Sequence, residues 1–351
     1  MAGKRKKVFV ALSGGVDSST AAALLRQNGF DCAGVFIVTN DESRGSQADA
    51  EEAAGKLGIK LYVLDLRSDF ERILDYFCSE YKRGRTPNPC VICNRYIKFG
   101  KLWDFARDNG AQLLATGHYA RIIEHNNKVG LYEAANGAKD QSYALAMIDK
   151  DILAYVIFPM GGYSKDQTRE MAAKFGLGTE KRRESQEICF IPNGDWGGVL
   201  ERRCPELVRK GNIVDTSGKI LGEHNGVHRF TIGQRRGLRV AMGKPYYVIK
   251  IDAESNTVTL GAKEEVMQRQ LRATGVNWLT SEPVSAFRAR VKIRYNDGGV
   301  SATVFPAGDG VFVEFDEPLA AITPGQLAVF YVQEGNSSRV AGGGWIERVT
   351  D

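Results

Sequence analysis

The chain has 351 residues, of which 43% are hydrophobic and 25% are charged, proportions typical of globular proteins. At about 150 residues per domain, this length predicts two to three domains, and the composition excludes a disordered, collagen-like or low-complexity chain. No apolar run approaches the roughly 18 residues needed to span a bilayer. The apolar run at residues 8–12 is too short for the core of a signal peptide, so we expect a cytoplasmic protein without membrane contact.

The net charge is only +5, but the basic residues gather in two segments. Residues 82–101 contain six Lys or Arg and no acidic residue, and residues 180–245 contain 13 Lys or Arg against eight Asp or Glu. Segments of this kind suit a polyanionic partner such as RNA, although ordinary solvated faces would give the same pattern.

The first half of the chain alternates strand and helix patterns. We expect strands at residues 8–12, 33–38, 60–66 and 112–116, and helices at residues 17–27, 48–57, 70–81, 96–109 and 165–175. This alternation predicts an open, mostly parallel sheet with helices on both faces. From residue 211 onward, short Val- and Ile-rich strands separated by turns predict β structure, with one short helical piece at residues 263–270.

A glycine-rich loop separates the first strand from the first helix, with the string Ser-Gly-Gly-Val-Asp-Ser-Ser at residues 13–19. Its glycines allow a tight turn, and the N–H groups of the following helix would face an anion. Asp17 would repel a phosphate, so it is better suited to hold Mg²⁺ against the phosphates of a nucleotide. The string is neither a Walker A loop nor a dinucleotide fingerprint, and a serine-capped glycine turn is the structural alternative.

Two separate segments carry the cysteines that suggest chemistry. Cys90 and Cys93 form a Cys-x-x-Cys pair within residues 86–99, behind two prolines and at the start of a helix flanked by Arg and Lys. This setting predicts a lowered thiol pKa and therefore a reactive thiolate. Cys189 lies about 96 residues further on, within residues 185–191. The remaining cysteines occupy apolar or helical contexts that indicate packing roles; they are Cys32, Cys78 and Cys204.

The glycine-rich string resembles the PP-loop of the N-type ATP pyrophosphatases, which split ATP between the α and β phosphates and adenylate an oxygen. Together with residues 86–99 and 185–191, it matches in order and spacing the tRNA-specific 2-thiouridylases (tRNA-uridine 2-sulfurtransferases). Further matching strings extend the resemblance over essentially the whole chain; they lie at residues 115–120, 139–143, 222–224, 231–238, 324–326 and 342–344.

This resemblance implies three domains. They are an α/β PP-loop ATP pyrophosphatase domain at residues 1–200, a small central β-rich linker domain at residues 201–265 and a tRNA-contacting C-terminal β-barrel at residues 266–351. It also implies ATP- and Mg²⁺-dependent 2-thiolation of the wobble uridine of tRNA, with release of AMP and pyrophosphate. The implied partners are the tRNA anticodon stem-loop and a persulfide donor, either a cysteine desulfurase or a sulfur relay protein.

The resemblance also assigns residues. It makes Cys189 the persulfide carrier and Cys93 the cysteine that helps release the sulfur. The implied ATP-binding residues are Ala11, Leu12, Ser13, Gly14, Gly15, Val16, Asp17, Ser18, Ile37 and Gly117. The implied tRNA-contacting residues are Asn88, Pro89, Cys90, His118, Lys139, Asp140, Gln141, Arg294, Tyr295 and Gln326. For His118, a capping or core histidine is the alternative.

The sequence departs from the family pattern at Cys90, where many members carry Asp. Cys90, Cys93 and Cys189 could together supply three thiolates to a 4Fe-4S cluster that binds an external sulfide at its fourth iron. A zinc site is less favoured, because no fourth Cys or His has the usual local spacing. Cys90 could also be a small buried loop residue.

Basic and apolar residues alternate at residues 285–295. On a strand, Arg288, Arg290, Lys292 and Arg294 would share one face, and the apolar residues would share the other. We expect the apolar face to pack in a β core and the basic face to meet a phosphate backbone. A solvated strand face is the alternative.

Two other functions fit parts of this pattern. A PP-loop ligase or amidotransferase that uses ammonia would need no cysteine. A tRNA-binding protein with a degenerate loop would need no catalysis, although the intact loop argues against it.

Overall fold

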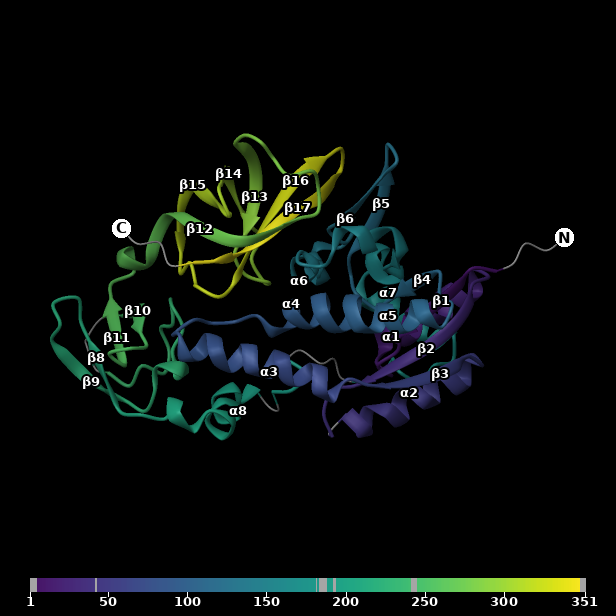
Figure 1. Ribbon diagram of the computed structural model, residues 1–351, viewed down its shortest axis with the longest axis horizontal. Coiled ribbons are helices and arrows are strands. Elements are labelled where there is room, and N and C mark those ends of the chain that lie inside the picture. Colours follow the sequence, from purple (N-terminus) through teal and green to yellow (C-terminus); the bar gives the residue numbers. More distant parts are fainter. Residues whose placement is uncertain are drawn as a thin grey trace.

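A computed structural model of the chain describes residues 5–41, 43–180, 182, 188–191, 194–240 and 245–347. It contains a five-stranded sheet, a four-stranded sheet and an eight-stranded sheet. Figure 1 shows the eight-stranded sheet lying over the helices of the first half, with the four-stranded sheet at one end of α3 (Arg67–Lys82). None of the helices in these described ranges is long and apolar enough to cross a membrane.

The five-stranded sheet is entirely parallel and confirms the predicted α/β architecture. Its strand order is β3-β2-β1-β4-β7, formed by β1 (Lys7–Ala11), β2 (Asp31–Val38), β3 (Lys60–Asp65), β4 (Leu113–Ala115) and β7 (Val156–Ile157). Successive residues of β1 point to opposite faces, so Phe9 joins one core cluster while Val8 and Val10 join another. Helices cover both faces; they include α1 (Val16–Gln27), α2 (Ser43–Leu57), α3, α5 (Leu102–Asp108) and α7 (Lys165–Lys174).

The helix that carries Cys90 and Cys93 begins earlier than predicted and changes type along its length. It consists of α4 (Pro89–Cys93), a π-helical segment η1 (Asn94–Lys101) and α5. At the end of η1 the Leu102 N–H donates to the Ile97 carbonyl, five residues back. Such segments are rare and frequently occur at functional sites.

Several shorter elements connect the sheet to the rest of the chain. The hairpin β5 (Arg121–His125) and β6 (Lys128–Tyr132), which sequence patterns did not reveal, joins the edge of the eight-stranded sheet. Short helices lie at α6 (Ser142–Leu145) and α8 (Trp196–Arg203). Turns of 3₁₀ helix lie at Gly137–Lys139, Lys150–Tyr155, Pro159–Gly162, Pro205–Leu207, Val227–Arg229 and Glu264–Val266.

The four-stranded sheet has a core of its own. Its order is β10-β11-β8-β9, formed by β8 (Gly211–Val214), β9 (Ile220–His224), β10 (Tyr247–Asp252) and β11 (Thr257–Gly261). The core contains Ile213, Val248, Val258 and Leu260. This sheet matches the small β-rich unit that the sequence predicted.

Six strands of the largest sheet close into a barrel through pairing of the first with the last. They are β12 (Met267–Trp278), β13 (Phe287–Lys292), β14 (Val300–Ala307), β15 (Gly310–Ala320), β16 (Leu327–Glu334) and β17 (Ser337–Ile346). The helical piece expected at residues 263–270 is wrong, because only Glu264–Val266 form a 3₁₀ turn and Met267 already pairs with Ala320 of β15. Cross-strand pairing therefore outweighs the local helical pattern.

The structure confirms the predicted packing of the apolar face of β13 but contradicts the role predicted for its basic face. Its apolar residues lie in the barrel core, but its cations pair with acids of this chain. Arg288 pairs with Asp316, while Lys292 contacts Glu133 at 2.9 Å and Asp140 at 3.4 Å. The expectation that this face meets a phosphate backbone is therefore wrong for Arg288 and Lys292, and likewise for Arg290, which also pairs with Glu133.

The ion pairs of Lys292 fasten the barrel to the segment that follows β6. Lys292, Glu133 and Asp140 are largely withdrawn from solvent, so each charge depends on its partners. Burial alone would raise the pKa of Glu133, but hydrogen bonds from Lys292 and Arg290 hold it below the ordinary 4.5. The contribution of this carboxylate to stability is therefore present above that pH and is lost as the pH falls through the lowered pKa.

We expect Lys292→Met to destabilise the protein by about 3 kcal/mol or more, because two buried carboxylates lose their shared cation. Arg288→Met is the matched control on the same strand, and its exposed partner Asp316 should tolerate the change with little loss. Urea denaturation at pH 7 measures both, and the deficit of Lys292→Met should shrink below about pH 4.5 as Glu133 protonates. Equal effects of the two variants would contradict this account.

Candidate active site

The glycine-rich loop forms a compact turn between β1 and α1. Gly14 has a φ of +77°, and a Cβ added there would lie 2.7 Å from the Ala50 nitrogen, so a side chain would not fit. The Ser13 N–H donates to Ser18 Oγ at 3.1 Å, which holds the loop against the first turn of α1. The first N–H groups of a helix have no partner within the helix, so this turn can receive an anion.

Asp17 lies in the first turn of α1 and is held from two directions. Lys165, the first residue of α7, donates to both of its carboxylate oxygens at 2.7 and 2.8 Å. The Tyr119 hydroxyl donates to Oδ1 at 2.7 Å. One carboxylate combined with substrate phosphates is a usual ligand set for Mg²⁺, so Asp17 fits the expected role. No sequence signal joined Lys165 to a residue 148 positions away.

The other residues expected at ATP follow the carboxyl ends of neighbouring strands. Ala11 ends β1, and Ile37 lies near the end of β2. A Cβ at Gly117, just after β4, would lie 2.8 Å from the Ser18 nitrogen, so the backbone there packs directly on the start of α1. Ligands of open α/β sheets bind at this edge. The sheet therefore gathers these residues as expected, while their contact with ATP stays a prediction.

The segment that carries Cys189 docks beside the Cys93 helix. Of the string at residues 185–191, residues 185–187 lie outside the described part of the chain. The Phe190 ring packs edge-on against Phe70 and Phe77 of α3, at centroid distances of 5.7 and 5.3 Å. Cys93 packs against the same hydrophobic cluster as Phe190. Two segments about 96 residues apart in sequence thus share one packing site.

Arg182 links this region to the glycine-rich loop. Its guanidinium donates to the Gly14 carbonyl at 2.7 Å and also contacts Glu52 and Asp49 of α2. Sequence patterns gave no reason to single out this arginine. It anchors the chain seven residues before Cys189 on the loop expected to bind phosphate.

The thiols are not activated in the way the sequence suggested. The expected lowering of the thiol pKa is wrong: desolvation raises the pKa of the partly buried Cys93 to about 12, and it also raises the pKa of Cys90 and Cys189, although both of these residues are exposed to solvent. Cys93 is the last residue of α4 inside a continuous helix, so it lies away from the positive N-terminal end. The charge of a Cys189 thiolate would raise the pKa of Cys93 further, which places the two thiols in electrostatic reach of each other.

Lys98 is the cation that counteracts the rise in pKa at all three thiols. Its ammonium group lowers the pKa of Cys90, Cys93 and Cys189, although burial is the larger effect in each case. Lys98 follows Cys93 by five residues. An α-helix brings residues three or four apart together, whereas π-helical bonds in η1 bring residues five apart together. The sequence predicts a lowered thiol pKa partly from a flanking Lys, but it does not reveal that this one ammonium group acts on all three thiols.

His118 holds the Lys98 side chain. Burial, reinforced by Lys98, sets the pKa of His118 well below 6.5, so its ring is neutral at physiological pH. Nε2 lies 3.5 Å from Lys98 Nζ, and Nδ1 lies 2.7 Å from Thr116 Oγ1. An ammonium group can only donate, so we assign the ring proton to Nδ1, which donates to Thr116.

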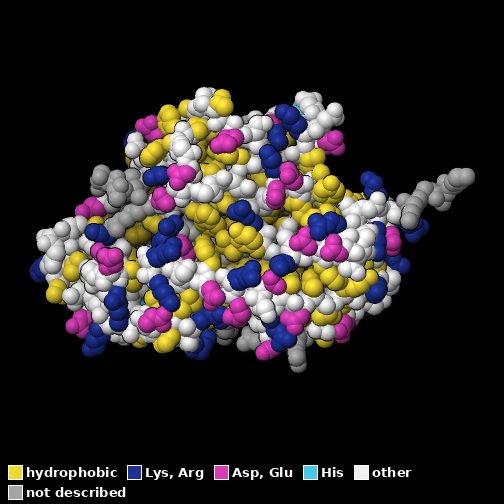
Figure 2. Space-filling model, viewed as in Figure 1, with side chains coloured by type: hydrophobic (Ala, Val, Ile, Leu, Met, Phe, Trp, Pro, Cys, Tyr) yellow, Lys and Arg dark blue, Asp and Glu magenta, His cyan; other side chains and the backbone are white. Residues whose placement is uncertain are grey.

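Most of the residues expected at tRNA surround the cysteine helix. Asn88 caps α4, with Pro89 at its first position, and its side chain acts to lower the pKa of Tyr143. The Tyr143 ring meets the Tyr295 ring at 6.4 Å, and the Gln141 side chain acts to lower the pKa of Tyr295. Figure 2 shows hydrophobic side chains gathered where the barrel meets these helices, with Lys and Arg around them.

The remaining expected tRNA contacts divide into two groups. Gln326 donates to the Thr86 carbonyl at 2.8 Å, which fastens the barrel beside the cysteine loop, whereas Arg294 donates to the Ala321 carbonyl within the barrel domain. Asp140 is buried and accepts hydrogen bonds from Ala134, Ser142 and Lys292, which is a structural role. Lys139, next to it, is half-buried.

The cysteines do not form a ready metal site. Among the residues that the structure describes, no three His, Cys, Asp or Glu side chains are arranged to hold a metal ion. This finding concerns a single metal ion, so the 4Fe-4S alternative with Cys90, Cys93 and Cys189 stays a prediction.

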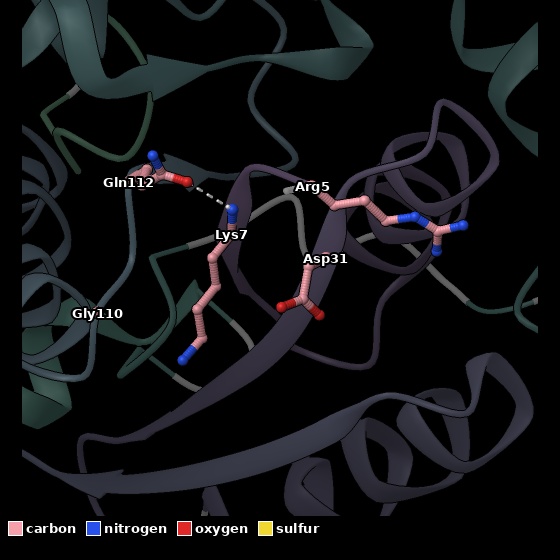
Figure 3. Close-up of a pocket in the computed structure, with 5 residues that line it drawn as sticks. All are labelled: Arg5, Lys7, Asp31, Gly110 and Gln112. Carbon is pink, nitrogen blue, oxygen red and sulfur yellow. Dashed lines mark hydrogen bonds between the residues drawn. The ribbon is translucent and has the colours of Figure 1, made fainter. Parts of the chain in front are cut away.

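A separate hollow lies at the opposite edge of the parallel sheet. Arg5, Lys7, Asp31, Gly110 and Gln112 line it, and Figure 3 shows the Lys7 backbone N–H donating to the Gln112 side chain. Lys7 and Asp31 are the first residues of β1 and β2, so this hollow faces away from the edge where the loop and the cysteines lie.

We expect Lys98→Gln to slow alkylation of Cys93 by iodoacetamide by about tenfold at pH 8, because one further unit of pKa means tenfold less thiolate. Mass spectrometry of the Cys93 peptide over pH 7–10 measures the rate. Lys101→Gln is the control on the same helical segment, since Lys101 pairs with Asp69 at 3.2 Å. Unchanged alkylation in Lys98→Gln would show that the ammonium group does not act on this thiol.

Comparison with known proteins extends along the whole chain. Three family models match consecutive segments: a tRNA methyl transferase HUP domain at residues 6–193, a tRNA methyl transferase PRC-barrel domain at residues 198–262 and an aminomethyltransferase beta-barrel domain at residues 268–346. The tRNA-specific 2-thiouridylase MnmA of Syntrophotalea carbinolica is 46% identical over 98% of this chain and 99% of its own length. The protein of that name from Carboxydothermus hydrogenoformans is 44% identical over 98% of each chain. The chain therefore belongs to the tRNA-specific 2-thiouridylase family.

Proposed function

We propose that this enzyme replaces the C2 oxygen of the wobble uridine of tRNA with sulfur, using ATP and releasing AMP and pyrophosphate. The observation that carries the proposal is the shared packing of Cys93 and the Cys189 segment beside a single ammonium group. Family membership and the geometry of the glycine-rich loop support the same reaction.

In the first step, the uridine C2 oxygen attacks the α-phosphate of ATP, and pyrophosphate leaves. The loop at residues 13–15 and the first turn of α1 supply N–H groups where the charge of the departing pyrophosphate develops. Asp17 would hold Mg²⁺ with the phosphates, and a bound Mg²⁺ would neutralise phosphate charge. Lys165 is placed to add a second cation at this edge.

In the second step, the terminal sulfur of a Cys189 persulfide attacks C2, and AMP leaves with the former oxygen. The Cys93 thiolate then attacks Cys189 Sγ, which breaks the S–S bond and leaves the transferred sulfur on C2. The electron pair of the broken bond remains with the nucleobase sulfur, and Cys93 and Cys189 end as a disulfide. An external dithiol must reduce this disulfide, and a persulfide donor must reload Cys189.

Lys98 and His118 give this site its charge balance. The ammonium group stabilises the anionic sulfurs that the second step requires, against the desolvation that opposes them. Neutral His118 keeps the ammonium group in place without adding a competing positive charge. Asn88, Gln141 and Tyr295 border the helix that carries Cys93 and would hold the flipped anticodon base.

We expect Cys93→Ser and Cys189→Ser each to abolish thiolation, because a hydroxyl group can neither carry a persulfide nor attack one. Pyrophosphate release on adding tRNA should persist for one turnover in both variants. Asp17→Asn should instead slow pyrophosphate release itself by about a hundredfold or more. Nucleoside mass spectrometry and pyrophosphate assays measure the two steps separately.

Cys90→Ser is the matched control for the cysteine variants. Under the persulfide route it should retain thiolation, whereas an iron–sulfur route would require Cys90 and bound iron. Full thiolation by Cys93→Ser or Cys189→Ser would contradict the proposed persulfide route. Unchanged product formation by Asp17→Asn would contradict the role given to the loop.

A further inference from the structure

A basic loop outside the catalytic site lies in the small β-rich unit, at residues 231–239 before β10. It carries three exposed arginines within five residues, Arg235, Arg236 and Arg239. Within the described ranges, no carboxylate lies in ion-pair distance of these guanidinium groups. Three other exposed arginines, Arg67, Arg107 and Arg288, each pair with a nearby acid.

Hydrogen bonds within the loop fix its shape. The Gln234 side chain accepts from the Thr231 N–H at 3.0 Å and donates to the Arg236 carbonyl at 3.0 Å. The Gly233 N–H donates to the Val248 carbonyl at 2.8 Å, and the Val248 N–H donates to the Gln234 carbonyl at 3.0 Å, which ties the loop to β10. The arginines are therefore presented from a rigid base.

The loop surrounds a hollow of about 250 Å³. Arg235 and Arg239 line it from two sides, together with Gly237 and Tyr246. Gly237 has a φ of +77° and Arg239 a φ of +55°, so the backbone turns tightly enough for both guanidinium groups to border the same space. A concave site with two cations suits a phosphate group.

The loop also lies where two other parts of the candidate active site meet. The Thr86 hydroxyl donates to the Thr231 hydroxyl at 3.4 Å, next to the segment that leads into the cysteine helix. On the barrel side, Gly233 packs on Ala321, and a Cβ at Gly233 would lie 3.8 Å from Arg294 Nη2. The start of this loop therefore contacts both the segment before the cysteine helix and the barrel.

We propose that residues 231–239 form a phosphate-binding site for the RNA backbone next to the modified base. This inference rests on tRNA being the substrate, and it adds a binding site in the small β-rich unit. RNA phosphates are the ligand that fits, because three cations without acidic partners can replace the counterions of a polyanion. An arginine guanidinium group can also donate two parallel hydrogen bonds to two oxygens of one phosphate.

The test is tRNA binding by the triple variant Arg235→Ala, Arg236→Ala, Arg239→Ala, measured by filter binding between 50 and 300 mM salt. We expect at least about tenfold weaker binding at low salt. The slope of log K against log salt should decrease by about two to three, roughly one for each lost phosphate contact. The triple Arg→Lys variant keeps three point charges and should retain most of the slope.

The control removes the same number of charges elsewhere, by changing Arg67, Arg107 and Arg288 to Ala. It should bind tRNA almost as the unchanged protein does, since those guanidinium groups are already paired. Equal losses in both triple variants, or no loss in the loop variant, would overturn the proposal. Thermal unfolding checks that the loop variant is folded. Because binding is measured without catalysis, tRNA binding without thiolation would contradict the proposed function and leave this site standing.

Discussion

Desolvation raises the pKa of the three cysteine thiols, and the Lys98 ammonium group lowers it. The chemistry of the site depends on the balance between these two effects. Raising the pKa of Cys93 from 9.0 to about 12 corresponds to about 4 kcal/mol against the thiolate. The site at rest therefore keeps the partly buried Cys93 mainly as the thiol, which is a weaker nucleophile than the thiolate. The Cys93 thiolate forms readily only when a nearby positive charge or a more polar environment lowers the pKa of the thiol. Lys98 already supplies one such positive charge. Under the proposed function, binding of the substrate and formation of the persulfide complete this change in the surroundings of Cys93.

The barrel shapes the site by holding the loop in front of the cysteine helix. Gln326 binds the Thr86 carbonyl, and the Thr86 N–H donates to the Pro324 carbonyl. The buried group of Lys292, Glu133 and Asp140 connects the barrel to the segment after β6. Several basic residues that look like RNA contacts in the sequence serve this assembly instead. The arginines of the loop at residues 231–239 have no described acid in ion-pair distance, unlike Arg288, Arg290 and Lys292 of strand β13, and this difference is the basis for proposing the loop as an RNA contact.

The sequence predicts the parallel sheet, the glycine-rich loop and the change to β structure, because these features depend on local periodicity and turn residues. Asp17 and Gly117 could be placed at one edge because the carboxyl ends of parallel strands converge. Lys165, Arg182 and Lys98 could not be found in this way. Lys165 and Arg182 act across long sequence separations, and Lys98 depends on a π-helical segment that no simple pattern reveals. The thiol pKa was mistaken in direction because burial, which one sequence does not display, outweighs neighbouring charges. The acids that neutralise β13 were missed for a similar reason, since Glu133 lies far from that strand in sequence.

The central claim is that Cys93 and Cys189 act on the same sulfur. The most direct measurement is peptide mapping by mass spectrometry after a single turnover of persulfide-loaded enzyme with ATP and tRNA, quenched by a thiol-blocking reagent. The account predicts a peptide pair joined by a Cys93–Cys189 disulfide, in an amount equal to the 2-thiouridine formed. Thiouridine formed while both cysteines are recovered as separate blocked thiols would contradict it.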